Sequence, residues 1–453
     1  MKFLQFSWNG GPPPKPQGDA PQIITSQAVI PDLPSEVWRK VIGFTVRLAG
    51  ANSIELDDPF STPYMNEEYP EVDPGLFEDR TTMSLVCSSW HAVVTEVSVE
   101  YLVIYSGKQL KGLVKKFESN KDNARKRLGE WTLQIDFKIL GKYSVAHIVQ
   151  LLQCTPNLLI YVNKNGPPTP ERPTPIEVIK GLVSHSSHSL RRVEWSGVGE
   201  APRYQDLVKL CTSLPNLTTL RLVAIFSFPY HWEGVPPPLV MPKLKTLSLT
   251  IIPKSTNHRP EYALTWDPFL QYISILPTQL PALERFECDI FPLFTMHFFN
   301  MHGSKLRLFR TTAWSAENVL PEALSLCPNL HSLVICQGSK TMALPIFHPT
   351  VAKICIIPTV EVHVAVPQKV FDYAVMAPLD DLLKSFERMV APHLVELRVQ
   401  NMGAYVTIAE HSTWLRFWWI RWNIQGVEFR DKTGASYQLV LDPNEALINS
   451  VRG

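Results

Sequence analysis

The stretch Pro215-Asn216-Leu217-Thr218-Thr219-Leu220-Arg221-Leu222 decides the fold that the sequence predicts. A Pro-Asn pair, typical of a turn, precedes the first leucine, and two further leucines follow with one polar residue between them. Such alternation turns apolar side chains to one face of an extended chain and polar side chains to the other. The stretch therefore predicts a short strand that follows a turn and buries one face.

The same pattern recurs after residue 120, often with a proline two residues before the first apolar position. The other copies are Pro156-Asn157-Leu158 to Val162, Leu190 to Trp195, Pro242 to Leu249, Pro281 to Cys288, Leu306 to Thr311, Pro328 to Ile335, Val351 to Ile356 and Pro392 to Val399. Leu190, Leu217 and Leu244 begin successive copies at steps of 27 residues. Steps of about 20 to 29 residues are typical of leucine-rich repeats.

Helical patterns lie between several of these predicted strands. They cover Val145 to Leu152, Ile176 to Val183, Gln205 to Cys211, Phe269 to Leu276, Val319 to Leu326 and Leu379 to Met389. One strand and one helix cannot bury their apolar faces alone, whereas stacked copies form a continuous core. The predicted fold class is α/β: over residues 106–453, an irregular leucine-rich-repeat solenoid with a parallel sheet on the concave face, helices outside and a C-terminal cap. An ordinary doubly wound α/β domain is the alternative.

The first 105 residues have a different character. Residues 1–29 are rich in glycine and proline and are predicted to form a flexible leader. Residues 30–105 are predicted to form a helical module, with one helix from Leu33 to Val46 and a second from Met83 to Val97, because apolar residues recur there at helical spacing. An acidic, proline-rich insert of about residues 49–78 separates the two helices.

The two helical segments carry a recognisable pair of motifs. Leu33-Pro34-x-Glu36-Val37, followed by Leu85-Val86-Cys87-Ser88-x-Trp90, resembles the F-box, a small three-helix module. The long insert departs from the usual spacing and is similar to the large mushroom-type fungal F-box group, as is the trailing run Val99 to Ile104. The Pro-Asn-Leu copies resemble the degenerate leucine-rich repeats that commonly follow an F-box. A generic amphipathic two-helix hairpin is the alternative.

The resemblance implies a partner and a non-enzymatic function. An F-box docks to the Skp-type adaptor of a cullin-RING ubiquitin ligase, and the solenoid would then be the receptor for a protein substrate. The adaptor-binding residues carried over from the motif are Leu33, Pro34, Val37, Ile42, Leu85, Val86, Cys87 and Trp90. No cofactor is expected. An adaptor-independent repeat scaffold, in which the first helices only cap the solenoid, is the alternative function.

The polar strand positions are the candidates for substrate contact, because strand alternation turns them toward the concave face. They are Thr219, Arg221, Thr246, Ser248, Arg285, Glu287, Ser332, Glu396 and Arg398. Their mixed charge favours a protein ligand over a phosphate backbone, with a solvated face that binds nothing as the alternative.

Composition excludes several function classes. Forty-three basic and 42 acidic residues give a net charge of +1, so no global field attracts nucleic acid or an anionic membrane. No stretch approaches 18 uninterrupted apolar residues, and no secretion signal is recognisable at the start. Seven scattered cysteines without a C-x-x-C pair predict reduced thiols and no zinc ribbon. The expected location is the cytoplasm, the nucleus or both.

Other motifs favour structural roles. The local signatures of hydrolases, zincins, kinases and dinucleotide-binding enzymes do not occur, and His185-x-x-His188 has no cysteine or acidic residue beside it to complete a metal site. The basic run Lys108 to Arg127 favours a solvated helix over phosphate binding, although it is also a candidate to neutralise the acidic insert. The aromatic cluster Trp414 to Trp422 favours a cap on the last repeat over a partner contact.

Overall fold

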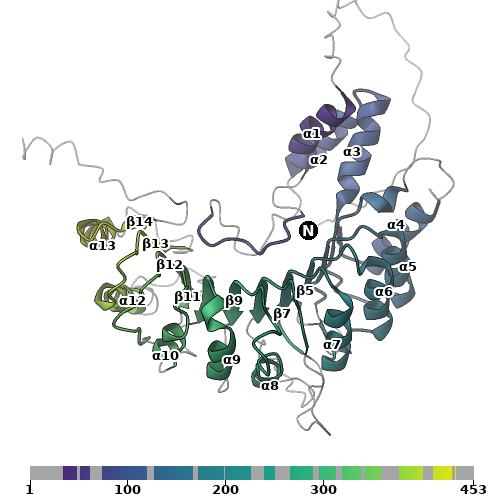
Figure 1. Ribbon diagram of the computed structural model, residues 1–453. Coiled ribbons are helices and arrows are strands. Elements are labelled where there is room, and N and C mark those ends of the chain that lie inside the picture. The colour runs from purple at the N-terminus through teal and green to yellow at the C-terminus, as the bar shows by residue number, and fades with distance from the viewer. Residues whose placement is uncertain are drawn as a thin grey trace, which may run out of the picture.

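The computed structural model describes residues 34–47, 52–61, 74–119, 127–166, 172–197, 199–225, 239–249, 266–288, 295–312, 319–337, 342–358, 377–400, 412–430 and 434. The described chain forms an arc, with strands along the inner side and helices along the outer side (Figure 1). The predicted leader, Leu33 and much of the acidic insert lie outside the described residues.

A 12-stranded sheet with the order β1-β2-β3-β5-β7-β8-β9-β10-β11-β12-β13-β14 forms the inner layer, and every pairing in it is parallel. Its strands are β1 (Tyr101–Ile104), β2 (Gln134–Phe137), β3 (Ile160–Asn163), β5 (Arg192–Trp195), β7 (Thr219–Leu222), β8 (Thr246–Leu249), β9 (Arg285–Cys288), β10 (Leu308–Thr312), β11 (Ser332–Gln337), β12 (Lys353–Pro358), β13 (Glu396–Val399) and β14 (Glu428–Arg430). A separate pair joins β4 (Arg172–Pro173) to β6 (Glu200–Ala201).

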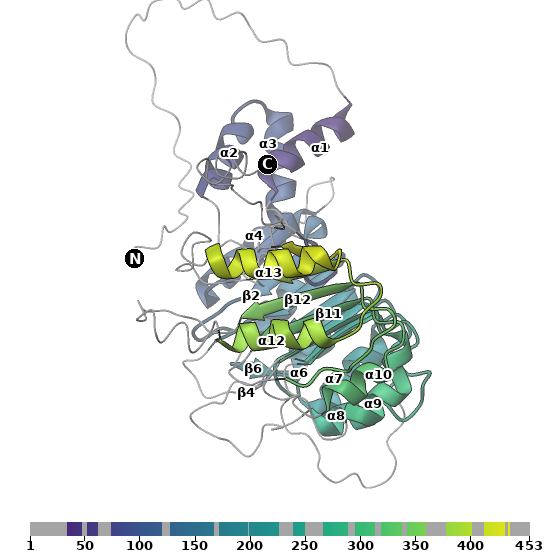
Figure 2. The ribbon, with the colours of Figure 1, turned by 90° about the vertical axis from the view of Figure 1, so that its left-hand side faces the viewer.

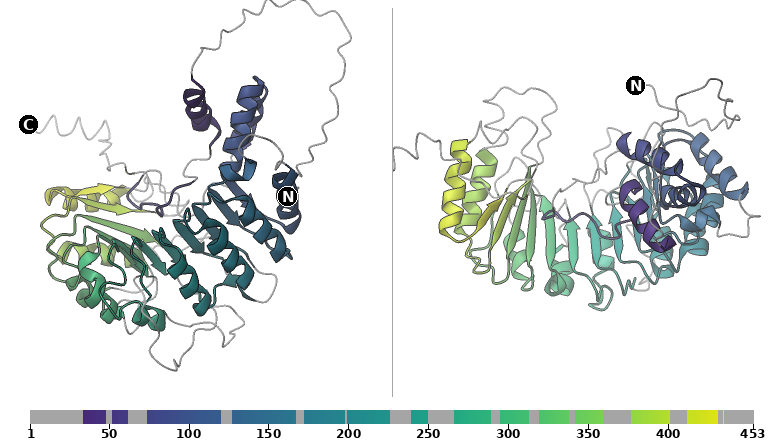
Figure 3. Two further views of the ribbon diagram at one scale, coloured as in Figure 1. Left: turned by 45° about the vertical axis from the view of Figure 1, so that its right-hand side comes forward. Right: turned by 90° about the horizontal axis from the view of Figure 1, so that it is seen from above.

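The outer layer consists of the helices that connect these strands (Figure 1). They are α4 (Gly107–Ser119), η1 (Leu128–Trp131), α5 (Val145–Cys154), α6 (Ile176–Ser186), α7 (Tyr204–Ser213), α8 (Asp267–Tyr272), α9 (Thr295–His302), η2 (Gly303–Lys305), α10 (Leu320–Ser325), α12 (Ala377–Arg388) and α13 (Ser412–Ile424). Because they cover only the convex side, the arrangement is a repeat solenoid of leucine-rich-repeat type and not a doubly wound domain (Figures 1 and 3).

One row of apolar side chains runs through the sheet and packs against the helices. The parallel register places these residues side by side: Val193, Leu220, Leu247, Phe286, Phe309, Leu333, Ile354, Leu397 and Phe429. All of them are buried in one core that extends from the first strands to α13. Within it the ring of Phe286 stacks on that of Phe309, with centroids 5.9 Å apart.

The nine strands expected from the repeat pattern are confirmed, and β1 and β14 are the end strands of the sheet. Strand β2 was not predicted, although Leu133, Ile135 and Phe137 alternate with polar residues there as in the other copies. Helix α9 was also missed, since its eight residues mix polar and apolar side chains without a clear helical spacing, and the buried Phe298 and Phe299 are adjacent.

Three helices precede the solenoid: α1 (Ser35–Val46), α2 (Pro74–Ser84) and α3 (Ser88–Glu100). The single helix predicted from Met83 to Val97 was wrong, because the chain turns between α2 and α3. Cys87 adopts an extended conformation there, and its sulfur accepts a hydrogen bond from the backbone N–H of Trp90, which caps α3. Part of the predicted insert is therefore helical, since α2 begins at Pro74.

The Pro-Asn-Leu signature has a direct structural explanation. The side-chain amide of Asn157 donates to the carbonyl of Glu130, that of Asn216 to His188, and that of Asn329 to Ser304, over 2.7 to 2.8 Å. Each accepting carbonyl belongs to the previous repeat, 25 to 28 residues earlier. The asparagine thus ties two repeats together, while the leucine that follows it enters the core.

We expect the two residues of this signature to contribute unequally to stability. Leu330→Ala should lower the free energy of unfolding by about 2 to 5 kcal/mol because it leaves a cavity in the core. Asn329→Ala should cost about 1 kcal/mol, since Asn329 is exposed and its amide makes one hydrogen bond to the preceding repeat. Chemical denaturation of both variants tests this order, and an equal loss would contradict it.

Candidate functional site

The polar side chains of the strands form the inner, concave face of the arc. The register sorts them into two rows, one through Arg192, Thr219, Thr246 and Arg285, the other through Glu194, Arg221, Ser248 and Glu287. The first row continues to Ser332 and Glu396, and the second to Arg398. All nine residues predicted for substrate contact therefore lie in these two rows.

Three buried carboxylates organise the charges on this face, each beside an arginine of its own strand. The ion pairs are Arg192–Glu194 at 2.6 Å on β5, Arg285–Glu287 at 2.5 Å on β9 and Arg398–Glu396 at 2.7 Å on β13. A basic residue of a neighbouring strand completes each cluster: Arg221 beside Glu194, Arg310 beside Glu287, and Arg430 and Lys353 beside Glu396. Ser248 also donates to Glu287 over 2.7 Å.

The electrostatic effect is clearest at Glu194, whose side chain is fully buried. Burial alone would raise the pKa of this carboxyl, but the charges of Arg192 and Arg221 outweigh it and lower the pKa to about 2. Glu194 is therefore ionised wherever the protein is folded near neutral pH. The arginine pair offsets the cost of placing this charge inside the protein.

A ten-residue segment, Asn52 to Ser61, crosses the concave face from strand to strand (Figures 1 and 3). We call it the strap. Its N-terminal end is fixed at β2, where the side-chain oxygen of Gln134 accepts a hydrogen bond from the backbone N–H of Asn52 over 2.8 Å. From there the strap follows the strand order toward β13.

The three strand arginines hold the strap by its main chain. Arg192 donates to the carbonyls of Ser53 and Glu55, Arg285 to those of Leu56 and Asp57, and Arg398 to that of Ser61, over 2.8 to 3.4 Å. Gln400, directly after β13, donates to the carbonyl of Pro59 over 2.6 Å. The strap is thus recognised mainly through atoms that every residue type carries.

One side chain of the strap enters an apolar pocket on the same face. Phe60 is 8% exposed and packs in a cluster formed by Leu308, Val334, Cys336, Cys355 and Ile357 from β10, β11 and β12. The ammonium of Lys353 lies over the Phe60 ring, 5.5 Å from its centroid. Leu56 and Pro59 are also buried, whereas Glu55 and Asp58 are exposed.

The residues predicted to contact substrate are thus less exposed to solvent than the residues of an uncovered face would be. Arg285 is half-buried and the other eight are buried, and Arg285 and Arg398 make hydrogen bonds to the strap. Charge reversal at Arg398 would place an unpaired carboxylate beside Glu396, so it would test folding and not binding. Their role in binding a substrate stays a prediction.

The strap was not predicted from the sequence, nor were several residues that hold it, including Arg192, Glu194 and Gln400. A signal was present: arginine and glutamate alternate two residues apart in Arg192-x-Glu194, Arg285-x-Glu287 and Glu396-x-Arg398. Side chains at that spacing share a face of a strand, so the repeat of this dyad marks charge pairs on the concave side. Nothing comparable marked the strap, whose contacts are mainly to its backbone.

The residues predicted to bind the adaptor divide into two groups on the helical module. Leu33 lies outside the described residues, Ile42 is fully buried, and Trp90 is half-buried against Trp38, with ring centroids 4.9 Å apart. The others are exposed, namely Pro34, Val37, Leu85, Val86 and Cys87. Ile42 and Trp90 therefore belong to the module's own core, together with Val46, Val94 and Val97.

The basic run and the aromatic cluster both lie on helices. The lysines of α4 are exposed while Leu110, Val114 and Phe117 face the core, and residues 120–126 of the run lie outside the described chain. The strap is held by strand side chains, among them Arg192, Arg285 and Arg398.

At the other end, α13 packs beside α12 (Figure 2). Trp418 and Trp422 are buried in the core, and the Trp418 indole donates to Asp380 over 2.9 Å, whereas the side chain of Trp414 is not among those described. This arrangement closes the last repeat. Phe417 and Ile424 remain exposed on the same helix.

Other candidate sites carry little chemistry. His185 is half-buried at the end of α6 and His188 is exposed, and among the described residues no group of three His, Cys, Asp or Glu side chains is arranged to hold a metal. All seven cysteines are free thiols, and burial raises the pKa of Cys211 and Cys327 to about 12. Of the described helices, none is long and apolar enough to cross a membrane.

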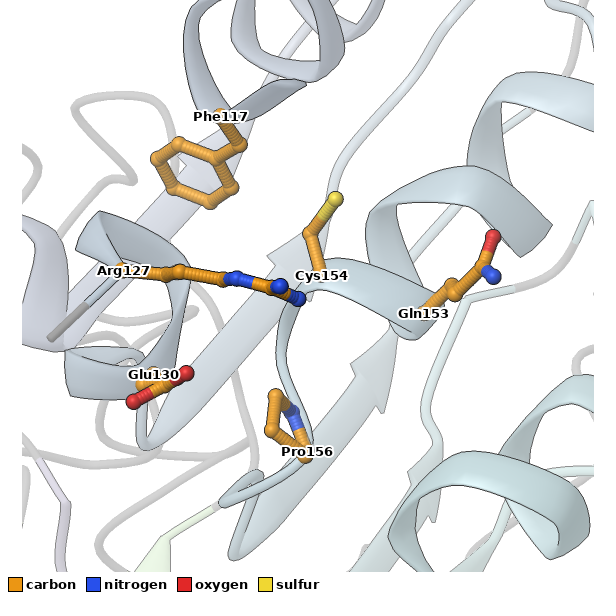
Figure 4. A pocket seen from close by; sticks show the side chains of 7 residues that line it. Phe117, Arg127, Glu130, Gln153, Cys154 and Pro156 are labelled. Atoms are coloured by element: carbon orange, nitrogen blue, oxygen red, sulfur yellow. The ribbon is translucent and has the colours of Figure 1, made fainter. Parts of the chain in front are cut away.

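A small cavity of about 90 Å³ lies where α4, η1 and α5 meet, lined by Phe117, Arg127, Glu130, Cys154 and neighbours (Figure 4). Figure 4 shows the Arg127 side chain extending across it between Phe117 and Pro156. Pockets that enclose a small-molecule ligand usually measure about 300 to 1,000 Å³. The size of this cavity gives no support to a substrate site.

Comparison with known proteins adds little to the geometry. No protein-family model matches the chain, and no curated protein matches it. Among solved structures, the leucine-rich repeat-containing protein LegL7 from Legionella pneumophila aligns with a TM-score of 0.38 and 13% identity, covering 69% of this chain and 95% of that one. The parallel strand order and the helices on one face of the sheet therefore identify the fold as a repeat solenoid.

We expect Glu194→Gln to change how stability depends on pH. The folded-state pKa of about 2 lies below the ordinary value of 4.5, so the carboxylate stabilises the fold above pH 4.5, and this contribution is lost as the pH falls toward 2. The variant should lose on the order of 3 kcal/mol at pH 7 and show a shallower decline between these two pH values.

Urea denaturation at pH 7, 4.5 and 3 measures this dependence. Glu118→Gln is the matched control, because Glu118 is exposed on α4 and its replacement should leave the pH profile unchanged. Parallel profiles for Glu194→Gln and the unaltered protein would show that the buried ion pairs do not stabilise the fold in this way.

Proposed function

We propose that this protein is the substrate receptor of a Skp-cullin-F-box type ubiquitin ligase. In this proposal the helical module docks the Skp-type adaptor, the solenoid binds a protein substrate, and the chain itself catalyses nothing. Its contribution is proximity: it raises the effective concentration of a substrate lysine near a ubiquitin-loaded enzyme. A repeat solenoid of this kind is typically an interaction scaffold, which agrees with the receptor half of the proposal.

The observation that carries the docking half is the set of apolar side chains left exposed on the module. Val37, Val41 and Phe44 recur on one face of α1 at steps of three and four residues, and Phe44 is 90% exposed. Leu85, 79% exposed, and Val86 protrude from the turn between α2 and α3. Exposed apolar side chains gathered in this way are typical of a surface that binds another protein.

These residues are exposed although the module has a complete apolar core of its own. The module has its own apolar cluster of Ile42, Val46, Val94 and Val97, with Met83 and Trp90 packed against it. The apolar residues of the module thus form two populations, one that holds the helices together and one that faces outward. The F-box resemblance assigns Val37, Leu85 and Val86, from the second population, to the adaptor contact.

The alternative function is a repeat scaffold without an adaptor, and the attachment of the module to the solenoid favours it. Helix α3 continues directly into β1, the backbone N–H of Leu133 donates to the carbonyl of Glu100 over 2.8 Å, and the guanidinium of Arg39 lies 4.3 Å from the ring centroid of Trp131. These contacts make the module a cap on the first strand. A cap needs no exposed Phe44 or Leu85, which is why docking is proposed first.

We expect Leu85→Asp to weaken binding of a purified Skp-type adaptor by about tenfold or more, because it places a charge in the proposed apolar contact. The fold should persist, since Leu85 is exposed. Isothermal titration calorimetry measures the affinity, and size-exclusion chromatography shows whether a one-to-one complex forms.

Ile346→Asp is the matched control, because Ile346 is 84% exposed but lies on the solenoid. It should leave adaptor affinity unchanged. If the unaltered protein and the adaptor elute separately, the scaffold function replaces the ligase function. Equal losses in both variants would instead assign the effect to general surface charge and not to the module.

A further inference from the structure

We infer that the concave face is a receptor for a peptide, and that the strap is an internal ligand which a partner must displace. The partner would present a segment with a leucine three residues before a Pro-Phe turn, the arrangement of Leu56, Pro59 and Phe60 in the strap. This inference deepens the receptor half of the proposed function and rests on that half alone.

The strap is bound in the manner of a peptide ligand. Arginines on three strands, β5, β9 and β13, donate to its carbonyls, and a single aromatic ring fills a pocket between β10 and β12. Hydrogen bonds to main-chain carbonyls supply affinity that does not depend on the peptide's side chains, while pockets for particular side chains supply specificity. The two features together describe a recognition site and not only a loop packed on a surface.

The site would persist without the strap, because its charges are balanced within the sheet. Arg192, Arg285 and Arg398 each keep a carboxylate partner on their own strand when the strap leaves. When a partner peptide replaces the strap, these three arginines keep their carboxylate partners, so they stay positioned to donate to the carbonyls of that peptide. Preorganisation of this kind lowers the entropic cost of binding.

The chemistry of the pocket limits what it accepts. Its wall consists of the side chains of Leu308, Val334, Cys336, Cys355 and Ile357, which suit an apolar ring, and Lys353 over the ring favours an aromatic one. The carbonyl of Pro59, next to the pocket, accepts from Gln400. Pro59 and Phe60 are the central residues of a turn, in which the backbone N–H of Ser61 donates to the carbonyl of Asp58 over 2.9 Å, and this turn carries the Phe60 ring into the cluster.

The covalent connection of the strap to the rest of the chain determines how strongly a partner peptide must compete with it. The strap lies in the chain between α1 and α2, so it acts on the concave face as an intramolecular ligand, for which effective concentrations on the order of millimolar are typical. A partner peptide must compete with it. Binding to the unaltered protein should therefore be weaker than binding to a chain whose strap cannot bind.

The test uses the full chain and a fluorescein-labelled peptide with the sequence of residues 52–61. In one variant the strap is replaced by a glycine-serine segment of equal length. Fluorescence anisotropy should show that this variant binds the peptide with a Kd of about 10 µM or tighter, and the unaltered protein at least about tenfold more weakly. A peptide with Phe60→Ser should bind the variant at least about tenfold more weakly than the parent peptide.

A second variant makes a smaller change, in case replacement of the whole strap unfolds the protein. Phe60→Ser in the full chain removes one ring from the concave face and leaves the apolar core of the repeats intact. It should bind the labelled peptide more tightly than the unaltered protein does. Circular dichroism and thermal melting confirm that each variant is folded before its binding is compared.

Two results would overturn the inference. Absence of peptide binding at about 100 µM to both folded variants would make the strap a fixed part of the fold. Equal affinity for the unaltered protein and the variants would place the peptide elsewhere. Because the assay contains no adaptor, either result leaves the docking of the helical module untouched, and failure of adaptor docking likewise leaves the peptide result intact.

Discussion

The stacked apolar row is the constraint on which the rest of the structure depends. Strands of mostly four to six residues cannot bury their apolar side chains alone, so Leu220, Phe286 and their counterparts must lie in register with those of the next repeat. This requirement fixes the strand order and places the connecting helices on one side. The opposite side of each strand contributes nothing to that core and is free to carry polar residues.

In this protein, the polar side of the strands carries a row of buried charges and not a solvated surface. Glu194, Glu287 and Glu396 lie at the centres of three clusters, and each is flanked by basic side chains from its own strand and a neighbouring one. Buried ion pairs add little net stability, because desolvation offsets most of the attraction. Their evident use here is positional, since the paired arginines are aimed at the backbone of the strap.

The strap connects the two halves of the proposed function. It lies between α1 and α2 in the sequence, yet its contacts are with strands as distant as β13, as in the hydrogen bond from Arg398 to Ser61. In the proposed mechanism, a substrate peptide that displaces the strap therefore releases a segment that belongs to the docking module. In the same proposal, the strap covers the receptor face while no partner is bound.

The sequence by itself determined the repeat architecture, because apolar alternation and the Pro-Asn-Leu turns are local patterns that any stacked parallel sheet must satisfy. It also placed Arg285, Glu287, Glu396 and Arg398 on the concave face, since strand alternation leaves no other side for them. Only the tertiary structure decided what covers that face. The strap is held mainly through its carbonyls, which carry no sequence signal, and the arginines that bind them lie more than 100 residues away, so no local pattern could reveal the contact.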